Sequence, residues 1–80
     1  MRRLIVNYSE DFRRNKVASE IYARLRDRNI HPVLVNVRYE TGTGIGRAEY
    51  LFNGQGEPNK KDLGEILKGI TLFSEPQFLE

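Results

Sequence analysis

The chain has 80 residues, of which 39% are apolar and 30% are charged, so it is long enough for one small globular domain spanning residues 1–80. The lack of cysteine and the single histidine argue against a disulfide framework and against a thiolate or histidine-rich metal site. No apolar run approaches the ~20 residues of a membrane-spanning helix, and the first residues show no signal-peptide pattern. We therefore expect a soluble, cytoplasmic protein with no cofactor and no membrane partner.

The first third of the chain predicts a strand followed by a helix. Residues 3–8 carry the apolar run Leu-Ile-Val, which is typical of a strand. The Ser-Glu-Asp sequence at residues 9–11 then offers a helix N-cap and acidic residues for a first turn. The apolar residues that follow recur at helical spacing, at Val17, Ala18, Ile21, Tyr22 and Leu25. We expect this helix to end near Asn29.

The middle of the chain predicts a β-hairpin. Residues 32–39 alternate strictly between an apolar and a more polar set, and this pattern indicates a half-buried strand. Residues 47–52 alternate again and place Ala48, Tyr50 and Phe52 on one face. The glycine-rich sequence at 41–46 connects two strands. A phosphate-binding loop instead leads from a strand into a helix, so we interpret this segment as a hairpin turn.

The last third predicts a second helix and an optional strand. Asn59 is an N-cap candidate for a helix over residues 60–68, and Gly69 is expected to end it. Apolar residues at 78 and 79 could add a short edge strand. With that strand the fold class is α+β with a ferredoxin-like βαββαβ two-layer sandwich; without it a truncated thioredoxin-like arrangement is the alternative.

Both arrangements place the helices on one face of the sheet and leave the other face open. Every second residue of the strand over residues 32–39, starting at Val33, is expected to face the helices. The open face would then carry six residues from two strands set side by side: Leu34, Asn36, Arg38, Arg3, Ile5 and Asn7. Because small domains often gain stability by association, we predict a homodimer formed by the sheet edges or by this face.

Positive charge is concentrated in the first part of the chain. Residues 1–47 contain ten basic and five acidic residues, a net charge of +5, whereas residues 48–80 contain three basic and six acidic residues, a net charge of −3. All nine arginines precede residue 48, and arginine binds phosphate with a rigid fork of donors. The predicted nucleic-acid-binding residues are Arg3, Arg13, Arg14, Lys16, Arg24, Arg28, Arg38 and Arg47.

This basic set predicts a non-enzymatic binding module. The spacing of Arg13, Lys16, Arg24 and Arg28 is expected to align their side chains along one flank of the first helix. The predicted partner is RNA, single-stranded DNA or an acidic protein.

The sequence offers no catalytic or metal-binding constellation. His31 has no serine, cysteine or carboxylate partner nearby in the sequence, so we expect an exposed loop residue. Glu10 and Asp11 lie where acidic residues support a helix N-terminus. Tyr39 and Tyr50 are expected to be core or cross-strand partners rather than a base-stacking platform.

Three stretches resemble families of small α+β domains. Residues 11–18 (Asp-Phe-Arg-Arg-Asn-Lys-Val-Ala) resemble the start of the first helix in Cas2-type CRISPR nucleases, although the chain reads Asn-Tyr-Ser where that family carries an aspartate. Residues 25–52 are similar to the middle of ACT regulatory domains, in which a helix ends in Asn-Ile and enters a long hairpin. The RNA-recognition motif shares the βαββαβ order. The ACT resemblance implies an alternative function, a regulatory or protein-interaction domain that homodimerises through its sheet.

Overall fold

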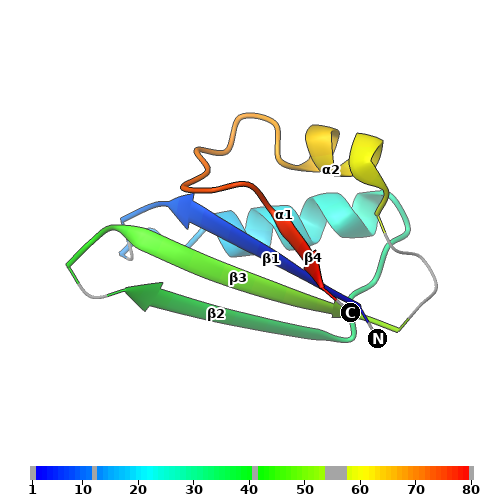
Figure 1. Cartoon of the computed structure of the whole chain (residues 1–80), viewed down its shortest axis with the longest axis horizontal. Coiled ribbons are helices and arrows are strands. Elements are labelled where there is room, and N and C mark those ends of the chain that lie inside the picture. The colour runs from blue at the N-terminus through cyan, green and yellow to red at the C-terminus, as the bar shows by residue number, and fades with distance from the viewer. Residues whose placement is uncertain (1, 12, 41, 54–57, 80) are drawn as a thin grey trace.

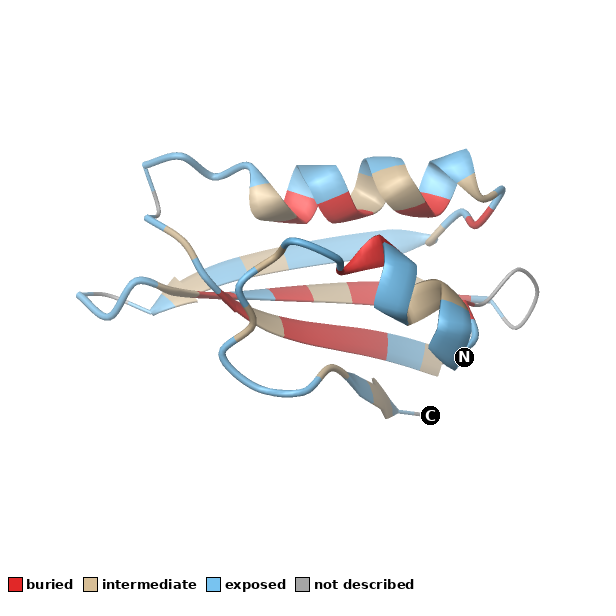
Figure 2. Ribbon diagram, turned by 90° about the horizontal axis from the view of Figure 1, so that it is seen from above, coloured by how far each residue is buried: buried red, intermediate tan, exposed pale blue. Residues whose placement is uncertain are grey.

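The computed structural model describes residues 2–11, 13–40, 42–53 and 58–79. Its elements are, in chain order, β1 (Arg2–Ser9), α1 (Val17–Asp27), β2 (Leu34–Glu40), β3 (Ile45–Phe52), α2 (Lys60–Ile66) and β4 (Gln77–Leu79). The strands form an antiparallel sheet in the order β2-β3-β1-β4, and both helices cover the same face of it (Figures 1 and 2). The fold is therefore a small α+β fold. In the described ranges no helix is both long and apolar enough to span a membrane.

The longest strand pairing joins β1 to β3. These strands pair over their full length, from Arg2 opposite Phe52 to Ser9 opposite Ile45. β4 pairs with the other side of β1, so the C-terminal segment does form a strand. β2 pairs with the far side of β3 and forms an edge of the sheet. The expectation that the strand around Asn36 lies directly beside the first strand is wrong, because β3 lies between them.

The hydrophobic core fills the space between the sheet and the two helices. Its buried residues are Leu4, Val6, Tyr8, Ala18, Ile21, Leu25, Ile30, Ala48, Tyr50, Phe52, Ile66 and Leu67. The predicted apolar stripe of the first helix and the predicted inner face of β3 are confirmed. A polar group deep in this core, the Tyr50 hydroxyl, donates a hydrogen bond to the Ala18 carbonyl at 2.8 Å. Each fully buried large side chain contributes about 1.5–3 kcal/mol of transfer free energy.

A tyrosine ring packs directly on a glycine in the sheet. Tyr8 and Gly46 are cross-strand partners, and a Cβ added to Gly46 would lie 2.5 Å from Cε2 of Tyr8. Tyr8 is fully buried and makes an edge-to-face contact with Tyr39, with the ring centroids 6.3 Å apart. Gly46 therefore belongs to β3, which begins at Ile45, and not to the predicted hairpin turn.

The first helix begins later than the sequence pattern suggested. Ser9 is the last residue of β1, and its N–H donates to the Thr71 carbonyl at 2.9 Å. Glu10 continues the sheet by donating its N–H to the Gly44 carbonyl, also at 2.9 Å. These sheet hydrogen bonds prevent a helix from starting at residues 9–11. Asn15 then adopts a left-handed backbone conformation (φ 47°), and α1 starts after Lys16, its N-cap residue.

The other helix ends follow the sequence. Asn29 has a left-handed backbone (φ 63°) just after α1, where asparagine commonly ends a helix. Asn59 caps α2 by accepting from the Asp62 N–H at 2.8 Å, and the Asp62 side chain accepts from the Asn59 N–H. Gly69 has a φ of 82° beyond the end of α2. The helix itself ends at Ile66, slightly before the predicted residue 68.

The strand with the clearest alternation is more exposed than expected. Val35, Val37 and Tyr39 lie on the helix side of the sheet, opposite Tyr50, Ala48 and Gly46 as predicted. Val35 nevertheless remains 37% exposed, and Val33 and Leu34 before it are more than half exposed. Figure 2 shows β2 exposed along most of its length. The prediction of a half-buried strand fails here because β2 is an edge strand that α1 covers only in part.

Two Gly→Ala substitutions test the packing of Tyr8. Gly46→Ala is expected to lower the free energy of unfolding by about 1–3 kcal/mol, because the new methyl group overlaps a buried ring. Gly64→Ala is the matched control: its added Cβ meets nothing within 4 Å, and alanine should stabilise α2 by about 0.5–1 kcal/mol. Urea unfolding followed by circular dichroism measures both values. Equal effects at the two positions would contradict the proposed packing.

Candidate functional site

One of the predicted nucleic-acid-binding arginines holds the two helices together. Arg24 donates from Nη1 to the Ile66 carbonyl at 2.6 Å and to the Lys68 carbonyl at 2.8 Å. From Nη2 it donates to the Glu20 carboxylate at 2.9 Å. Carbonyl groups at a helix C-terminus lack partners within the helix, and a cation there complements the helix dipole. The Arg24 guanidinium therefore serves as a cap for α2.

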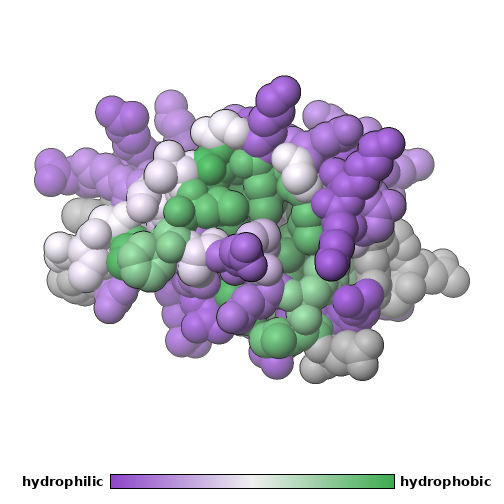
Figure 3. All heavy atoms as spheres, turned by 45° about the horizontal axis from the view of Figure 1, so that its top comes forward, coloured by the Kyte–Doolittle hydropathy of each residue, from purple (hydrophilic) through white to green (hydrophobic). Residues whose placement is uncertain are grey.

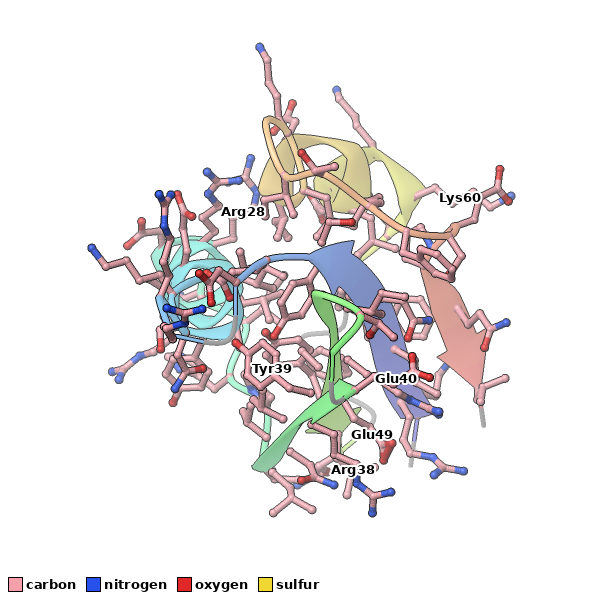
Figure 4. The ribbon with its side chains drawn as sticks, turned by 90° about the vertical axis from the view of Figure 1, so that its left-hand side faces the viewer. Arg28, Arg38, Tyr39, Glu40, Glu49 and Lys60 are labelled. Carbon is pink, nitrogen blue, oxygen red and sulfur yellow. The ribbon has the colours of Figure 1, made fainter. Side chains whose placement is uncertain are left out.

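Two further predicted arginines are engaged in ion pairs. Arg28 pairs with Glu65 and lies between α1 and α2 (Figure 4). Arg3, on the open face of the sheet, places Nη1 3.6 Å from Oε2 of Glu49 on β3. Arg28 thus links two elements of the fold, whereas the Arg3 pair is long and exposed.

The remaining basic residues of the predicted flank precede α1 rather than line it. Lys16 is the N-cap residue, and Arg13 lies in a turn in which its backbone N–H donates to Oδ1 of Asp11 at 3.0 Å. Arg13, Arg14 and Lys16 are all exposed. Because α1 starts only at Val17, these residues do not align with Arg24 along one helical flank. The structure brings no continuous basic stripe together on α1.

Glu10 organises the loop before α1. Its Oε2 accepts hydrogen bonds from the N–H groups of Lys16 at 2.9 Å and Val17 at 3.1 Å, so it supports the helix N-terminus from outside the helix. Its Oε1 accepts from the Tyr39 hydroxyl at 2.9 Å, which also lies 2.9 Å from Oδ1 of Asn15. Glu10 thus supports the start of α1 from outside the helix, although neither it nor Asp11 lies in the first turn as expected, and Asp11 accepts from the Arg13 N–H instead.

The tyrosine hydroxyls beside Glu10 resist ionisation. Burial, hydrogen bonds with Tyr8 and Glu10 and the nearby negative charge raise the pKa of Tyr39 above its usual value. Burial is also the main cause of the raised pKa of Tyr8 and of Tyr50. At neutral pH these groups are therefore protonated hydrogen-bond donors: the Tyr39 hydroxyl holds Glu10 and Asn15 of the loop, and the Tyr50 hydroxyl holds the Ala18 carbonyl of α1.

The open face of the sheet brings two other predicted residues together. Arg38 on β2 and Arg47 on β3 are directly opposite each other in the register, on the face that no helix covers. Neither guanidinium group forms an ion pair with any residue that the structure describes. In Figure 4, Arg38 and Glu49 point away from the helices, whereas Tyr39 of the same strand points toward α1.

The line of open-face residues that begins with Arg38 and Arg47 continues across β1 and the segment that follows α2. Arg47 lies opposite Asn7 of β1, and the Asn7 carbonyl accepts a hydrogen bond from the Phe73 N–H at 2.9 Å. Leu72 packs into the core, so Phe73, the next residue, points to the open side, where its side chain is 62% exposed. We call these four residues the open-face row: Arg38, Arg47, Asn7 and Phe73.

The sequence indicated only part of this row. Period-two alternation placed Arg38 and Asn7 on the open face, and it extends to Arg47 by the same reasoning. Phe73 was missed because its position depends on pairing with β1, which is distant in the chain. Ile5 was expected to be exposed here but is 1% exposed, in a register position between Glu49 of β3 and Gln77 of β4.

Two shallow apolar hollows flank the sheet on the helix side. One of about 450 Å³ lies between α1 and β2 and is lined by Ala18, Ser19, Tyr22, Pro32, Val33, Leu34, Val35 and Val37. A second of about 590 Å³ lies between α2 and β4, where Figure 3 shows apolar side chains gathered between polar ones. Neither has a cluster of catalytic groups in its lining. Within the described ranges no three acidic or histidine side chains are grouped to bind a metal ion.

Comparison with known proteins adds no assignment. No protein-family model matches the chain, and no curated protein matches it.

Substitution of Arg24 tests its capping role. Arg24→Gln is expected to lower the free energy of unfolding by about 1–2 kcal/mol, because it removes charged hydrogen bonds to two carbonyls and a carboxylate. Arg26→Gln removes the same charge from the exposed side of α1 and should change stability by less than about 0.5 kcal/mol. Denaturant unfolding of both variants measures the difference. A neutral Arg24→Gln variant would show that the cap contributes nothing.

The tyrosine cluster predicts a loss of stability at alkaline pH. The pKa of Tyr39 is higher in the folded state than its ordinary value of 10.0, so the folded state binds the phenolic proton more tightly. Its contribution to the free energy of unfolding is complete below pH 10 and is lost as the pH rises above that value. Tyr39→Phe should therefore show a shallower decline of stability above pH 10 than the wild type. Parallel declines in pH-dependent unfolding curves would refute this coupling.

Proposed function

We propose that the chain is a non-enzymatic module of ferredoxin-like architecture that binds single-stranded nucleic acid on the open face of its sheet. The element order supports the architecture: β1 and β2 run in the same direction with β3 between them, and β4 pairs with β1. The helices are confined to the other face, which leaves the open-face row accessible.

The observation that carries the proposal is the pair Arg38 and Arg47. Like charges directly opposite each other on a sheet are destabilising, and no described carboxylate is ion-paired with either of them. A phosphate group bound between the two guanidinium groups would remove this repulsion and accept their forked donors. Two phosphate-binding arginine side chains on adjacent strands suit a polyanion better than a single small carboxylate.

The exposed ring of Phe73 favours single-stranded over double-stranded nucleic acid as the partner. Exposed aromatic side chains beside a basic track are the combination that proteins use to stack unpaired bases. Neighbouring strands lie about 4.8 Å apart, so the row from Arg38 to Phe73 extends over about 14 Å. Asn7 lies between the arginines and the ring; its Nδ2 donates to the Ser74 hydroxyl at 3.3 Å, so the group that it offers to an unpaired base is its amide oxygen. A duplex keeps its bases stacked internally and would leave Phe73 without a partner.

The negative charge of Glu49 weakens the binding of a nucleic acid to this face. Its carboxylate lies on the open face and is ion-paired with Arg3 at 3.6 Å, so that it reduces the positive charge available to phosphate. This arrangement favours weak binding with little sequence preference.

Fluorescence polarisation with a labelled oligouridylate and the matching oligodeoxythymidylate tests the proposal. The wild type should bind at about 50 mM salt and weaken strongly by about 200 mM. The double variant Arg38→Ala/Arg47→Ala should bind more weakly and reduce the slope of log affinity against log salt by about 0.7, because the one phosphate contact that the two guanidinium groups share is lost. The control Arg14→Ala/Lys16→Ala removes the same charge near α1 and should retain most of the affinity.

Two single variants sharpen this experiment. Phe73→Ala should weaken binding by about 1–3 kcal/mol without changing the salt slope, because stacking releases no counterions. Glu49→Gln should strengthen binding, since it frees Arg3 and removes a negative charge. No binding by the wild type at about 50 mM salt, or a larger loss in the Arg14→Ala/Lys16→Ala control, would contradict the open-face assignment.

A further inference from the structure

The first half of β2 presents apolar side chains at the free edge of the sheet, whereas its second half carries the charged residues Arg38 and Glu40. Edge strands of monomeric proteins are usually shielded by lysine, proline within the strand, a bulge or a covering loop. Here Val33, Leu34 and Val35 follow one another at this edge and are 54%, 59% and 37% exposed. This first part of the edge is thus apolar on both faces of the sheet.

The hydrogen-bonding pattern identifies which backbone groups point outward from this edge. Ser9 lies opposite Ile45 but donates its N–H away from β3, to the Thr71 carbonyl. Ser9 and Ile45 are therefore a non-hydrogen-bonded pair, and Ile45 directs its backbone groups toward Glu40 of β2.

Alternation extends this pattern along β2. The even-numbered residues from Leu34 to Glu40 lie opposite odd-numbered residues of β3 and so direct their backbone groups toward β3. Just before them, the Val33 N–H also donates to β3, to the Leu51 carbonyl at 2.7 Å. The residues between the even-numbered ones direct both N–H and C=O toward the free edge: Val35, Val37 and Tyr39. These six backbone groups form a short, regular ladder, and none of the described strands lies beside it.

We propose that β2 pairs antiparallel with β2 of a second copy, about a two-fold axis at Val37. In this register Val37 of each copy faces Val37 of the other, and Val35 faces Tyr39 of the other. All six outward groups of both copies then form hydrogen bonds. Within the described strand, centring the axis on Asn36 or Arg38 leaves one of the three residues unpaired.

The side chains fit the same register. On the helix side, valine faces valine and Val35 faces the ring of Tyr39, an aromatic–β-branched pair that stabilises sheets. On the open side, Asn36 faces Arg38 and Leu34 faces Glu40, so no like charges are directly opposite. Centring the axis on Arg38 would instead set two arginines against each other.

The hollow between α1 and β2 lies along the same edge. It is lined by small residues of α1, Ala18 and Ser19, together with the exposed valines of the edge. A second copy seated on β2 would bring its own α1 toward this hollow and cover apolar surface that the monomer leaves exposed. The result is one continuous eight-stranded sheet with both helix layers on the same side. This pairing does not depend on nucleic-acid binding.

Sedimentation velocity and single-residue variants test the pairing. The wild type at tens of micromolar should sediment with twice the 9.3 kDa mass of the chain. Val35→Lys places a charge at the paired edge and should raise the dissociation constant at least about tenfold, with an unchanged circular dichroism spectrum. Leu79→Lys is the matched control, since Leu79 is similarly exposed (40%) on the opposite edge strand and should leave the dimer intact.

A disulfide test locates the axis. The chain has no cysteine, so Val37→Cys introduces a single thiol. Hydrogen-bonded partners have Cα atoms about 5.5 Å apart, which is within the range of a disulfide. Mild oxidation should therefore link Val37→Cys into a covalent dimer, whereas Phe73→Cys should remain monomeric on a denaturing gel. A 9.3 kDa species in sedimentation, dissociation by Leu79→Lys in place of Val35→Lys, or linkage only through Phe73→Cys would each overturn the proposed interface.

Discussion

The antiparallel pairing of β1 with β3 is the interaction on which the rest of the structure depends. It places Tyr8 over Gly46, and this close packing fixes the Tyr8 ring beside Tyr39. Tyr39 in turn donates to Glu10, whose carboxylate supports the start of α1. One glycine without a side chain thus determines where a loop, a helix and an edge strand meet. The same pairing aligns Arg47 with Asn7 on the opposite face.

The positive charge of the N-terminal part serves two different purposes. On the helix side, Arg24 and Arg28 have partners on α2 and dock the two helices, so their charges are used within the fold. On the open side, Arg38 and Arg47 stand opposite each other without such partners among the described residues. Net charge alone could not separate these two groups. What separates them is whether a carbonyl or carboxylate lies within hydrogen-bond distance.

The two proposals concern different unsatisfied parts of one sheet. The open-face row offers charged and aromatic side chains, whereas the free edge of β2 offers backbone groups and apolar side chains. Pairing of two β2 strands would extend the open face and leave it uncovered. Both copies of Arg38 would then lie near the two-fold axis, so a polyanion bound there could contact both subunits. The binding and association experiments remain independent because they change different residues.

Local patterns in the sequence determined much of the fold of this protein. Alternation identified the inner residues of β3, the apolar stripe identified the buried side of α1, and Asn59 and Gly69 identified the ends of α2, because each signal depends on neighbours within one turn or strand. Tertiary structure alone decided the start of α1, the central place of β3, the exposure of β2 and the fates of the arginines. Each of these depends on contacts between residues far apart in the chain: Ser9 with Thr71, Arg24 with Ile66 and Asn7 with Phe73. Such contacts follow from how the elements pack, and no local spacing encodes them.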